Sequence, residues 1–238
     1  MKNSAAELVG KVAWPDVATQ LHSKGYARVP GFLSPAECES LIALYENPSA
    51  YRKTVVMEHK GYGLGEYKYF DYPLPDLVQD LREAVYSELA PVANIWMERL
   101  RMDSSFPGSL AQLRAQCHAR GQLKPTPLLL KYGPGWFNAL HQDLYGDVFF
   151  PLQMAVILSR PGIDYSGGEF VLTQQAARSQ GRALVLNPDR GEMIIFTTNC
   201  RPEQGARGFR RLNVKHGVSE VHSGSRYTLG IIFHDAQS

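Results

Sequence analysis

The chain has 238 residues, 44% of them hydrophobic, and its 25 basic and 23 acidic side chains leave a formal net charge of +2. This length buries one sizeable core and is short for two full domains, so we expect a single domain over residues 1–238. The nearly balanced charge excludes a protein that attracts polyanions through its overall charge. Any polyanion-binding surface must therefore come from local clustering of basic side chains.

The cysteines and the N-terminal sequence favour a cytoplasmic protein. Cys38, Cys117 and Cys200 are too few and too widely spaced for a disulfide framework or a cysteine-based zinc site. The N-terminal stretch MKNSAAELVGKVAW lacks the apolar run of a signal peptide, and the longest apolar run, VFFPLQMAVIL, contains Pro151 and Gln153. We therefore expect a chain that stays in a reducing compartment and does not enter a membrane.

Residues 1–101 are expected to be mainly helical and to provide support and a lid for the rest of the chain. Ser34 can cap a helix that has Pro35 at its first position and Glu37 three residues after the cap, as in a capping box. The stretch PDLVQDLREAVYSELAPVANIWMERL has a second helical pattern, which we expect to be interrupted at Pro91.

After a connecting segment over residues 102–126, which has room for one short helix, the sequence reads as a series of short strands. The apolar or alternating runs are PLLLKY, LQMAVILS, GEFVLTQ, ALVLN, GEMIIFT, RLNVKHGVSEV and RYTLGIIFH. Short strands at this spacing are typical of a sandwich or barrel rather than of alternating βαβ units. The sequence thus predicts an α+β fold with a jelly-roll (double-stranded β-helix) core over residues 127–238 and supporting N-terminal helices.

The stretch LKYGPGWFNALHQDLYGD places His141 and Asp143 two residues apart, just after a Tyr-Gly-Pro-Gly turn. At the end of a strand, side chains at positions i and i+2 point to one face and can reach one ion. Such a pair also arises in ordinary turns, where the aspartate accepts backbone hydrogen bonds. A third ligand is needed to separate a metal site from a polar turn.

His216 is the best candidate for this third ligand, because it lies on an expected strand near the end of the sheet, in NVKHGVSEV. The other histidines lie in helical or connecting parts, in a turn, or at the far end of the last strand: His22, His59, His118, His222 and His234. We call His141, Asp143 and His216 the triad. Two imidazoles and one carboxylate on one face, with open positions beside them, are typical of non-haem Fe(II) oxygenases.

Arg226, ten residues after His216, is suited to hold the far carboxylate of a 2-oxo acid that chelates iron. Its planar guanidinium can grip a carboxylate through two parallel hydrogen bonds. Thr228 can add a hydroxyl from the same strand face, and Tyr132, nine residues before His141, can add a phenol from a neighbouring strand. A solvent-exposed strand arginine is the alternative interpretation of Arg226.

In this order, these residues resemble the Fe(II)/2-oxoglutarate-dependent dioxygenase superfamily over roughly residues 127–236. SGGEFVLTQ and HGVSEVHSGSRYTL are most similar to the prolyl-hydroxylase branch. KYGPGWFNALHQD resembles the AlkB-type nucleic-acid demethylases, as does GLGEYKYFDYPLPDLVQDL, where that family carries part of its nucleotide-binding lid. The chain departs from the AlkB pattern at Ile232, six residues after Arg226, where that family has a second arginine.

The resemblance implies an enzyme that binds Fe(II) through the triad and uses 2-oxoglutarate and O2 as co-substrates. 2-Oxoglutarate would chelate the iron through its 2-oxo acid end, and Arg226, Thr228 and Tyr132 would hold its other end. The implied reaction is hydroxylation of a substrate C–H bond with release of succinate and CO2.

Two further stretches bear on the substrate. GEYKYFDYP supplies Tyr67 and Tyr69, which in a lid can stack on a base or enclose a proline ring; the alternative is a half-buried hairpin edge. NCRPEQGARGFRRLNVKHG places Arg207, Arg210 and Arg211 shortly before the third ligand, where they would steer a polyanion towards the site. A solvated, flexible loop is the alternative for this run.

These features favour oxidative demethylation of alkylated nucleic acid, as in DNA repair. A peptidyl (prolyl-type) hydroxylase, a small-molecule oxygenase and a non-catalytic metal-binding jelly roll are the alternatives. The intact Arg226 argues against the non-catalytic module, and a purely structural protein would need no triad. The oligomeric state is left open.

Overall fold

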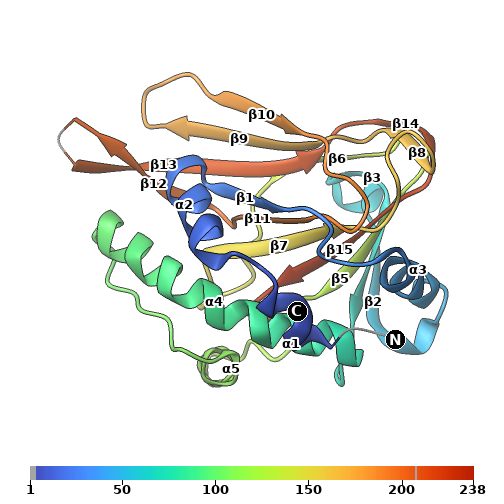
Figure 1. Ribbon diagram of the computed structural model, residues 1–238, viewed down its shortest axis with the longest axis horizontal. Helices are drawn as coiled ribbons and strands as arrows, with labels where there is room; N and C mark the ends of the chain where they lie inside the picture. The colour runs from blue at the N-terminus through green and yellow to red at the C-terminus, as the bar shows by residue number, and fades with distance from the viewer. Residues whose placement is uncertain (1–3, 207) are drawn as a thin grey trace.

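Two antiparallel sheets packed face to face form the centre of the computed structural model, which describes residues 4–206 and 208–238 (Figure 1). The strands are β1 (Tyr26–Val29), β2 (Tyr51–Val56), β3 (Gly63–Leu64), β4 (Glu66–Phe70), β5 (Leu128–Tyr132), β6 (Phe137–His141), β7 (Leu152–Ile157), β8 (Tyr165–Gly167), β9 (Phe170–Ala176), β10 (Arg182–Leu186), β11 (Met193–Thr197), β12 (Cys200–Gly205), β13 (Gly208–Val218), β14 (Val221–Gly224) and β15 (Arg226–Ile232). The larger sheet has the order β1-β11-β7-β15-β5-β4-β2 and the smaller one β10-β9-β13-β6-β3, with β12 paired to β13. Strands β14 and β8 form a separate pair.

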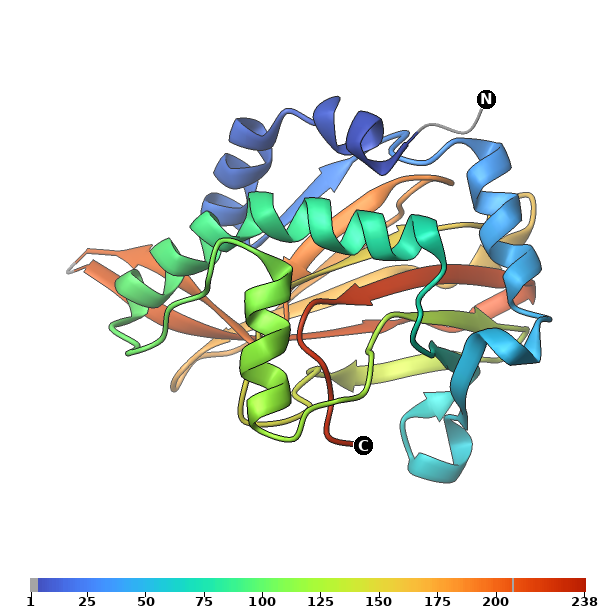
Figure 2. The same ribbon diagram turned by 90° about the horizontal axis from the view of Figure 1, so that it is seen from below.

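Helices cover the outer face of the larger sheet, and the longest of them, α4, runs across it (Figure 2). The helices are α1 (Ala5–Gly10), α2 (Trp14–Lys24), α3 (Pro35–Leu44), α4 (Asp76–Leu100) and α5 (Leu110–Ala119), with short 3-10 turns η1 (Pro48–Ala50) and η2 (Glu58–Lys60). Buried α4 side chains such as Leu81 and Val85 share one apolar core with Leu229 and Ile231 of β15. The predicted α+β jelly roll with supporting helices is confirmed.

The seven apolar runs from residue 127 onwards are all strands, and the segment at 102–126 contains one short helix, α5. The expectation that residues 1–101 are mainly helical is incomplete, because β1 to β4 also lie there. Strand β1 extends one edge of the larger sheet beside β11, and β4 and β2 extend the other edge beside β5. These strands are short or mixed in polarity, so their pairing partners decide their structure.

Helix α3 begins as predicted. The Ser34 hydroxyl accepts a hydrogen bond from the Glu37 N–H, and the Glu37 carboxylate accepts one from the Ser34 N–H. The predicted interruption at Pro91 is wrong, because α4 continues through it. Pro91 is exposed, so the Ser87 carbonyl that it leaves without a helical partner faces water, and the buried face continues on both sides.

Alternation along the strands separates two environments. In β15, Leu229 and Ile231 face the helices, whereas Arg226, Thr228 and Ile232 line the space between the two sheets. Because successive side chains point to opposite faces of a sheet, one strand serves both the core and the site.

The three cysteines are buried and free. No helix within the described residues has both the length and the apolar character that crossing a membrane requires.

Candidate metal centre

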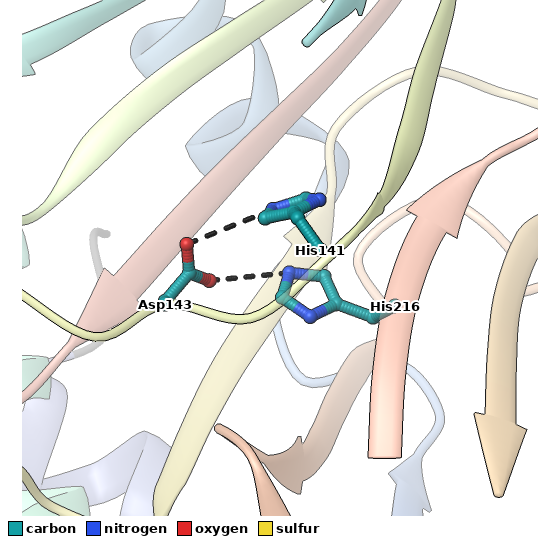
Figure 3. Close-up of side chains that lie close together, drawn as sticks. All are labelled: His141, Asp143 and His216. Carbon is teal, nitrogen blue, oxygen red and sulfur yellow. Dashed lines mark ion pairs between the residues drawn. The ribbon is translucent and has the colours of Figure 1, made fainter. Parts of the chain in front are cut away.

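The structure brings the triad together between the two sheets (Figure 3). His141 ends β6, Asp143 follows two residues later, and His216 lies on β13 directly opposite His141 in the strand register. One potential ligand atom from each residue lies within 4.8 Å of the others. Nε2 of His216 is 3.1 Å from Oδ2 of Asp143, and Nε2 of His141 is 3.6 Å from Oδ1. This donor set suits one divalent transition metal ion with open positions beside it.

Local hydrogen bonds orient the first two members. Nδ1 of His141 lies 2.7 Å from the Ala139 carbonyl, to which it donates, so that Nε2 presents a lone pair towards Asp143. The side chain of Gln142, between them, turns away from the site and donates to the carbonyls of Asn199 and Val214, each at 2.8 Å. No local sequence pattern predicts this role of Gln142, because its partners depend on strand pairing.

The electrostatics of Asp143 and His141 favour the protonation states in which these side chains bind a metal ion. Burial alone would raise the pKa of Asp143, but the imidazoles of His216 and His141 and a hydrogen bond from Tyr145 hold that pKa well below its usual range. Burial, together with the neighbouring His216, lowers the pKa of His141. At neutral pH, Asp143 is therefore a carboxylate and His141 a neutral imidazole, as metal ligands must be.

Behind Asp143 lies a pair of tyrosines that the sequence analysis did not assign to this place. The Tyr145 hydroxyl donates to Oδ1 of Asp143 at 2.6 Å, and the Tyr69 hydroxyl donates to that of Tyr145 at 3.2 Å. Tyr69 is buried, and its hydroxyl is engaged with Tyr145, so the prediction that it stacks on a substrate is wrong. Tyr67, which lies two residues before Tyr69 on β4, does line the cavity.

Arg226 is fully buried, and its surroundings fit a carboxylate ligand. It pairs with Tyr132 in the register of β15 and β5, and its Nη1 donates to the Thr228 hydroxyl at 2.7 Å. Its Nε has no hydrogen-bond partner, and no carboxylate within the described part of the chain lies within 4.0 Å of its guanidinium. A buried cation without an anion is costly, so this geometry favours an anionic ligand over the alternative of a surface arginine. Asn138 donates to the Tyr132 hydroxyl at 3.1 Å and so orients that ring.

One cavity of about 430 Å³ joins the triad to Arg226, Thr228 and Tyr132. This is the size of a small-molecule site. Its rim carries Tyr62, Leu140 and Leu144, each more than 40% exposed, which the sequence analysis did not single out. The cavity therefore combines the charged and polar groups of the site with a largely apolar wall and an aromatic and aliphatic rim.

The basic run before His216 is a hairpin rather than a loop, formed by β12 and β13 and projecting away from the sheets (Figure 1). Arg210 lies six residues before His216, about 20 Å along the strand, and pairs with Glu203. Arg211 is exposed and points to the opposite face from His216, since the two are an odd number of residues apart. Arg207 lies outside the described residues. The hairpin therefore places Arg210 and Arg211 away from the site, and this position does not support the prediction that they steer a polyanion towards it.

With this geometry established, the comparisons with known proteins identify the family. The family model Oxygenase-NA, described as "Oxygenase, catalysing oxidative methylation of damaged DNA", matches residues 65–236. The chain belongs to this family. It is also 45% identical over 167 residues to the uncharacterized proteins MT2286 and Rv2227 of two strains of Mycobacterium tuberculosis, a match that covers 70% of this chain and 72% of each relative.

Solved structures share the fold of this Oxygenase-NA protein. A prolyl-4-hydroxylase from Pseudomonas putida aligns with a TM-score of 0.57 and 16% identity, covering 93% of this chain and 98% of that one. An oxidoreductase of the 2OG-Fe(II) oxygenase family from Burkholderia pseudomallei aligns with a TM-score of 0.55 and 14% identity, covering 95% and 94%. At these identities the likeness concerns the fold. Family and facial triad together make this Oxygenase-NA protein an enzyme of the 2OG-Fe(II) oxygenase superfamily, and the predicted superfamily is confirmed.

Proposed function

We propose that residues 1–238 act as a single dioxygenase domain that removes alkyl groups oxidatively from damaged nucleic acid in the cytoplasm. The triad would bind Fe(II), and Arg226, Thr228 and Tyr132 would bind 2-oxoglutarate. The observation that carries this proposal is the single cavity in which the triad faces a buried arginine without a carboxylate partner, in a chain of the Oxygenase-NA family.

Each group has a defined task. Fe(II), when bound, supplies the activation of O2 that couples decarboxylation of 2-oxoglutarate to oxidation of a C–H bond. The guanidinium of Arg226, held by Thr228, fixes the far carboxylate of the co-substrate, and the apolar wall limits access of water. One oxygen atom of O2 enters succinate, and the other becomes a hydroxyl on the alkyl carbon. A hydroxymethyl group on a base nitrogen then leaves as formaldehyde, which restores the base.

The entrance supports a base as the substrate. Tyr67 lines the cavity, and Tyr62 stands half exposed at its rim, so both offer aromatic faces to an unpaired base. A base must leave its stack to reach a buried catalytic centre, and stacking on such rings offsets part of that cost. Support for nucleic acid therefore comes from the family match and these tyrosines, and not from the distant hairpin arginines.

The test is to incubate the Fe(II)-loaded protein with 2-oxoglutarate and three pools: methylated single-stranded oligonucleotides, their unmodified counterparts and proline-containing peptides. We expect mass spectrometry to detect loss of methyl groups from the first pool, with succinate formed in proportion. The Asp143→Ala variant is the control for adventitious iron chemistry. Hydroxylated peptide with unchanged oligonucleotides would contradict the substrate proposal and favour a peptidyl hydroxylase. Failure to bind Fe(II) and 2-oxoglutarate would contradict the proposal as a whole.

A further inference from the structure

Gln153 is a buried amide that the proposed function has not yet used. Its side chain is 3% exposed and lines the cavity, and its Nε2 has no hydrogen-bond partner in the part of the chain that the structure describes. A buried donor without a partner costs free energy, and a ligand in the cavity that accepted its hydrogen bond would remove this cost.

The strand register fixes where this amide lies. On β7, Leu152 and Met154 belong to the helix-facing core, so Gln153 faces the other sheet. Gln153 is paired with Phe196 of β11 on one side and with Ile232 of β15 on the other. The Phe196 ring packs 4.9 Å from the His216 ring. The amide therefore lies one strand away from a side chain that contacts the triad.

Arg226 and Gln153 stand towards opposite ends of the cavity. The Arg226 guanidinium is hydrogen-bonded to the Thr228 hydroxyl, and Ile232, the register partner of Gln153, lies four residues after Thr228 on β15, about 13 Å along the strand. The two carboxyl carbons of 2-oxoglutarate are separated by four C–C bonds of about 1.5 Å each. With a hydrogen bond of about 2.9 Å at each end, one molecule spans on the order of 10–13 Å. The spacing matches one co-substrate molecule held at both ends.

Three other polar side chains near the triad already donate hydrogen bonds within the protein. The Gln142 amide donates to two backbone carbonyls, Asn138 donates to the Tyr132 hydroxyl, and Tyr145 donates to Asp143. Ile232, beside Gln153, has no polar atom in its side chain. Besides Gln153 Nε2, the buried cavity atoms without a partner in the described part of the chain are Nε of Arg226 and Nδ1 of His216, so Gln153 supplies the unpartnered amide.

We propose that the Gln153 amide donates a hydrogen bond to the carboxylate at the 2-oxo acid end of 2-oxoglutarate, the end that chelates the metal. This inference rests on the proposed function and deepens it. The chain then holds its co-substrate with a cation at one end and a neutral amide at the other. A neutral amide at this position can orient the carboxylate without a second positive charge beside the metal.

The test measures binding rather than turnover. Anaerobic titrations of the Fe(II)-loaded protein, followed by calorimetry and by charge-transfer absorption, would compare 2-oxoglutarate with pyruvate, which has only the 2-oxo acid end. For Gln153→Leu we expect the Kd of both acids to rise by about the same factor, tenfold or more, the size expected for one hydrogen bond to a charged group. For Arg226→Ala we expect a rise for 2-oxoglutarate alone. Gln153→Glu should weaken both acids further than leucine does, because two carboxylates repel each other.

Two readouts separate this role from a structural one. The Kd for Fe(II) in the absence of a 2-oxo acid should be unchanged in Gln153→Leu. The Tm of the metal-free protein should be equal to or higher than that of the parent, because leucine removes an unsatisfied buried donor. A lower Tm together with weaker Fe(II) binding would assign Gln153 a structural role and overturn the proposal.

The failure of this inference is distinguishable from the failure of the proposed function. If the parent binds Fe(II) and 2-oxoglutarate but both Gln153 variants bind the acid equally well, the inference alone is overturned. The same holds if the variants weaken 2-oxoglutarate but not pyruvate, since Gln153 would then act at the other end. If the parent binds no 2-oxoglutarate, the proposed function is overturned and this inference with it.

Discussion

Two buried arginines, Arg82 and Arg226, show how differently this chain treats the same side chain in two regions. Arg82, on α4, donates to the Ile232 and Phe233 carbonyls, to the Tyr72 hydroxyl and to Asp235, with which it forms a fully buried ion pair. Arg226, in the cavity, donates to Thr228 and has no carboxylate partner in residues 4–206 and 208–238.

The difference distinguishes an arginine that stabilises the fold from an arginine that is available to a ligand. The Arg82 network is satisfied within the protein and joins α4 to the end of the last strand, so its removal harms the fold. The Arg226 guanidinium is buried and its Nε has no partner among the described residues, so the proposed co-substrate would complete its hydrogen bonds. Of the ten buried side-chain atoms without a partner among the described residues, three belong to residues that line the cavity: Nε of Arg226, Nε2 of Gln153 and Nδ1 of His216. It is the coincidence of such atoms with a cavity that indicates a binding site.

The largest expected effect tests the structural side of this comparison. Arg82→Ala leaves Asp235 buried without its main cation, and we expect it to lower the free energy of unfolding by about 3–5 kcal/mol. Urea unfolding, followed by circular dichroism, measures this. Arg226→Leu is the matched variant and should unfold with unchanged or increased stability when no ligand is present. Equal losses in the two variants would contradict the distinction.

The next effect concerns the metal. Asp143→Ala removes the carboxylate of the triad, and we expect the affinity for Fe(II) to fall at least about a hundredfold, with loss of turnover. Anaerobic metal titration checks this, with His222→Ala as the control, because His222 lies on β14 outside the triad. Retained iron binding in Asp143→Ala, or its loss in His222→Ala, would move the metal site.

A smaller effect is expected behind the carboxylate. Tyr145→Phe removes the hydroxyl that donates to Asp143, and we expect about a tenfold loss of Fe(II) affinity, as is usual for residues that orient a metal ligand. Tyr69→Phe, which touches only the Tyr145 hydroxyl, should have a smaller effect. Should the Tyr69 variant bind iron more weakly than the Tyr145 variant, the proposed hierarchy of contacts is wrong.

The smallest effect is expected at the hairpin. The double variant Arg210→Ala/Arg211→Ala alters charges about 17–20 Å along the strand from His216, and we expect kcat/KM on a methylated oligonucleotide to stay within about twofold of the parent. Steady-state kinetics at physiological salt measures this. A loss of tenfold or more would mean that nucleic acid reaches the hairpin while its base is in the cavity.

The sequence was sufficient to single out the candidate site residues whose chemistry is rare and whose spacing is local. The His-x-Asp pair, a strand histidine and Arg226 follow from ligand chemistry and from the period of two along a strand. The same period, applied to Arg211 and His216, would have placed the arginine on the opposite face. The roles of Gln142, Tyr145 and Gln153 depend on which strands pair and in which register, and no local pattern contains that information.

The most direct measurement of the central claim is the thermal shift that 2-oxoglutarate causes in the metal-loaded protein, for the parent and for Arg226→Leu. A ligand that binds only the folded state raises the Tm in proportion to the logarithm of its concentration over its Kd. We predict a clear, concentration-dependent rise for the parent, a much smaller one for Arg226→Leu, and a partial one for Arg226→Lys, which cannot form the planar pair. Equal shifts in the parent and in Arg226→Leu would contradict the claim that this buried arginine holds the co-substrate.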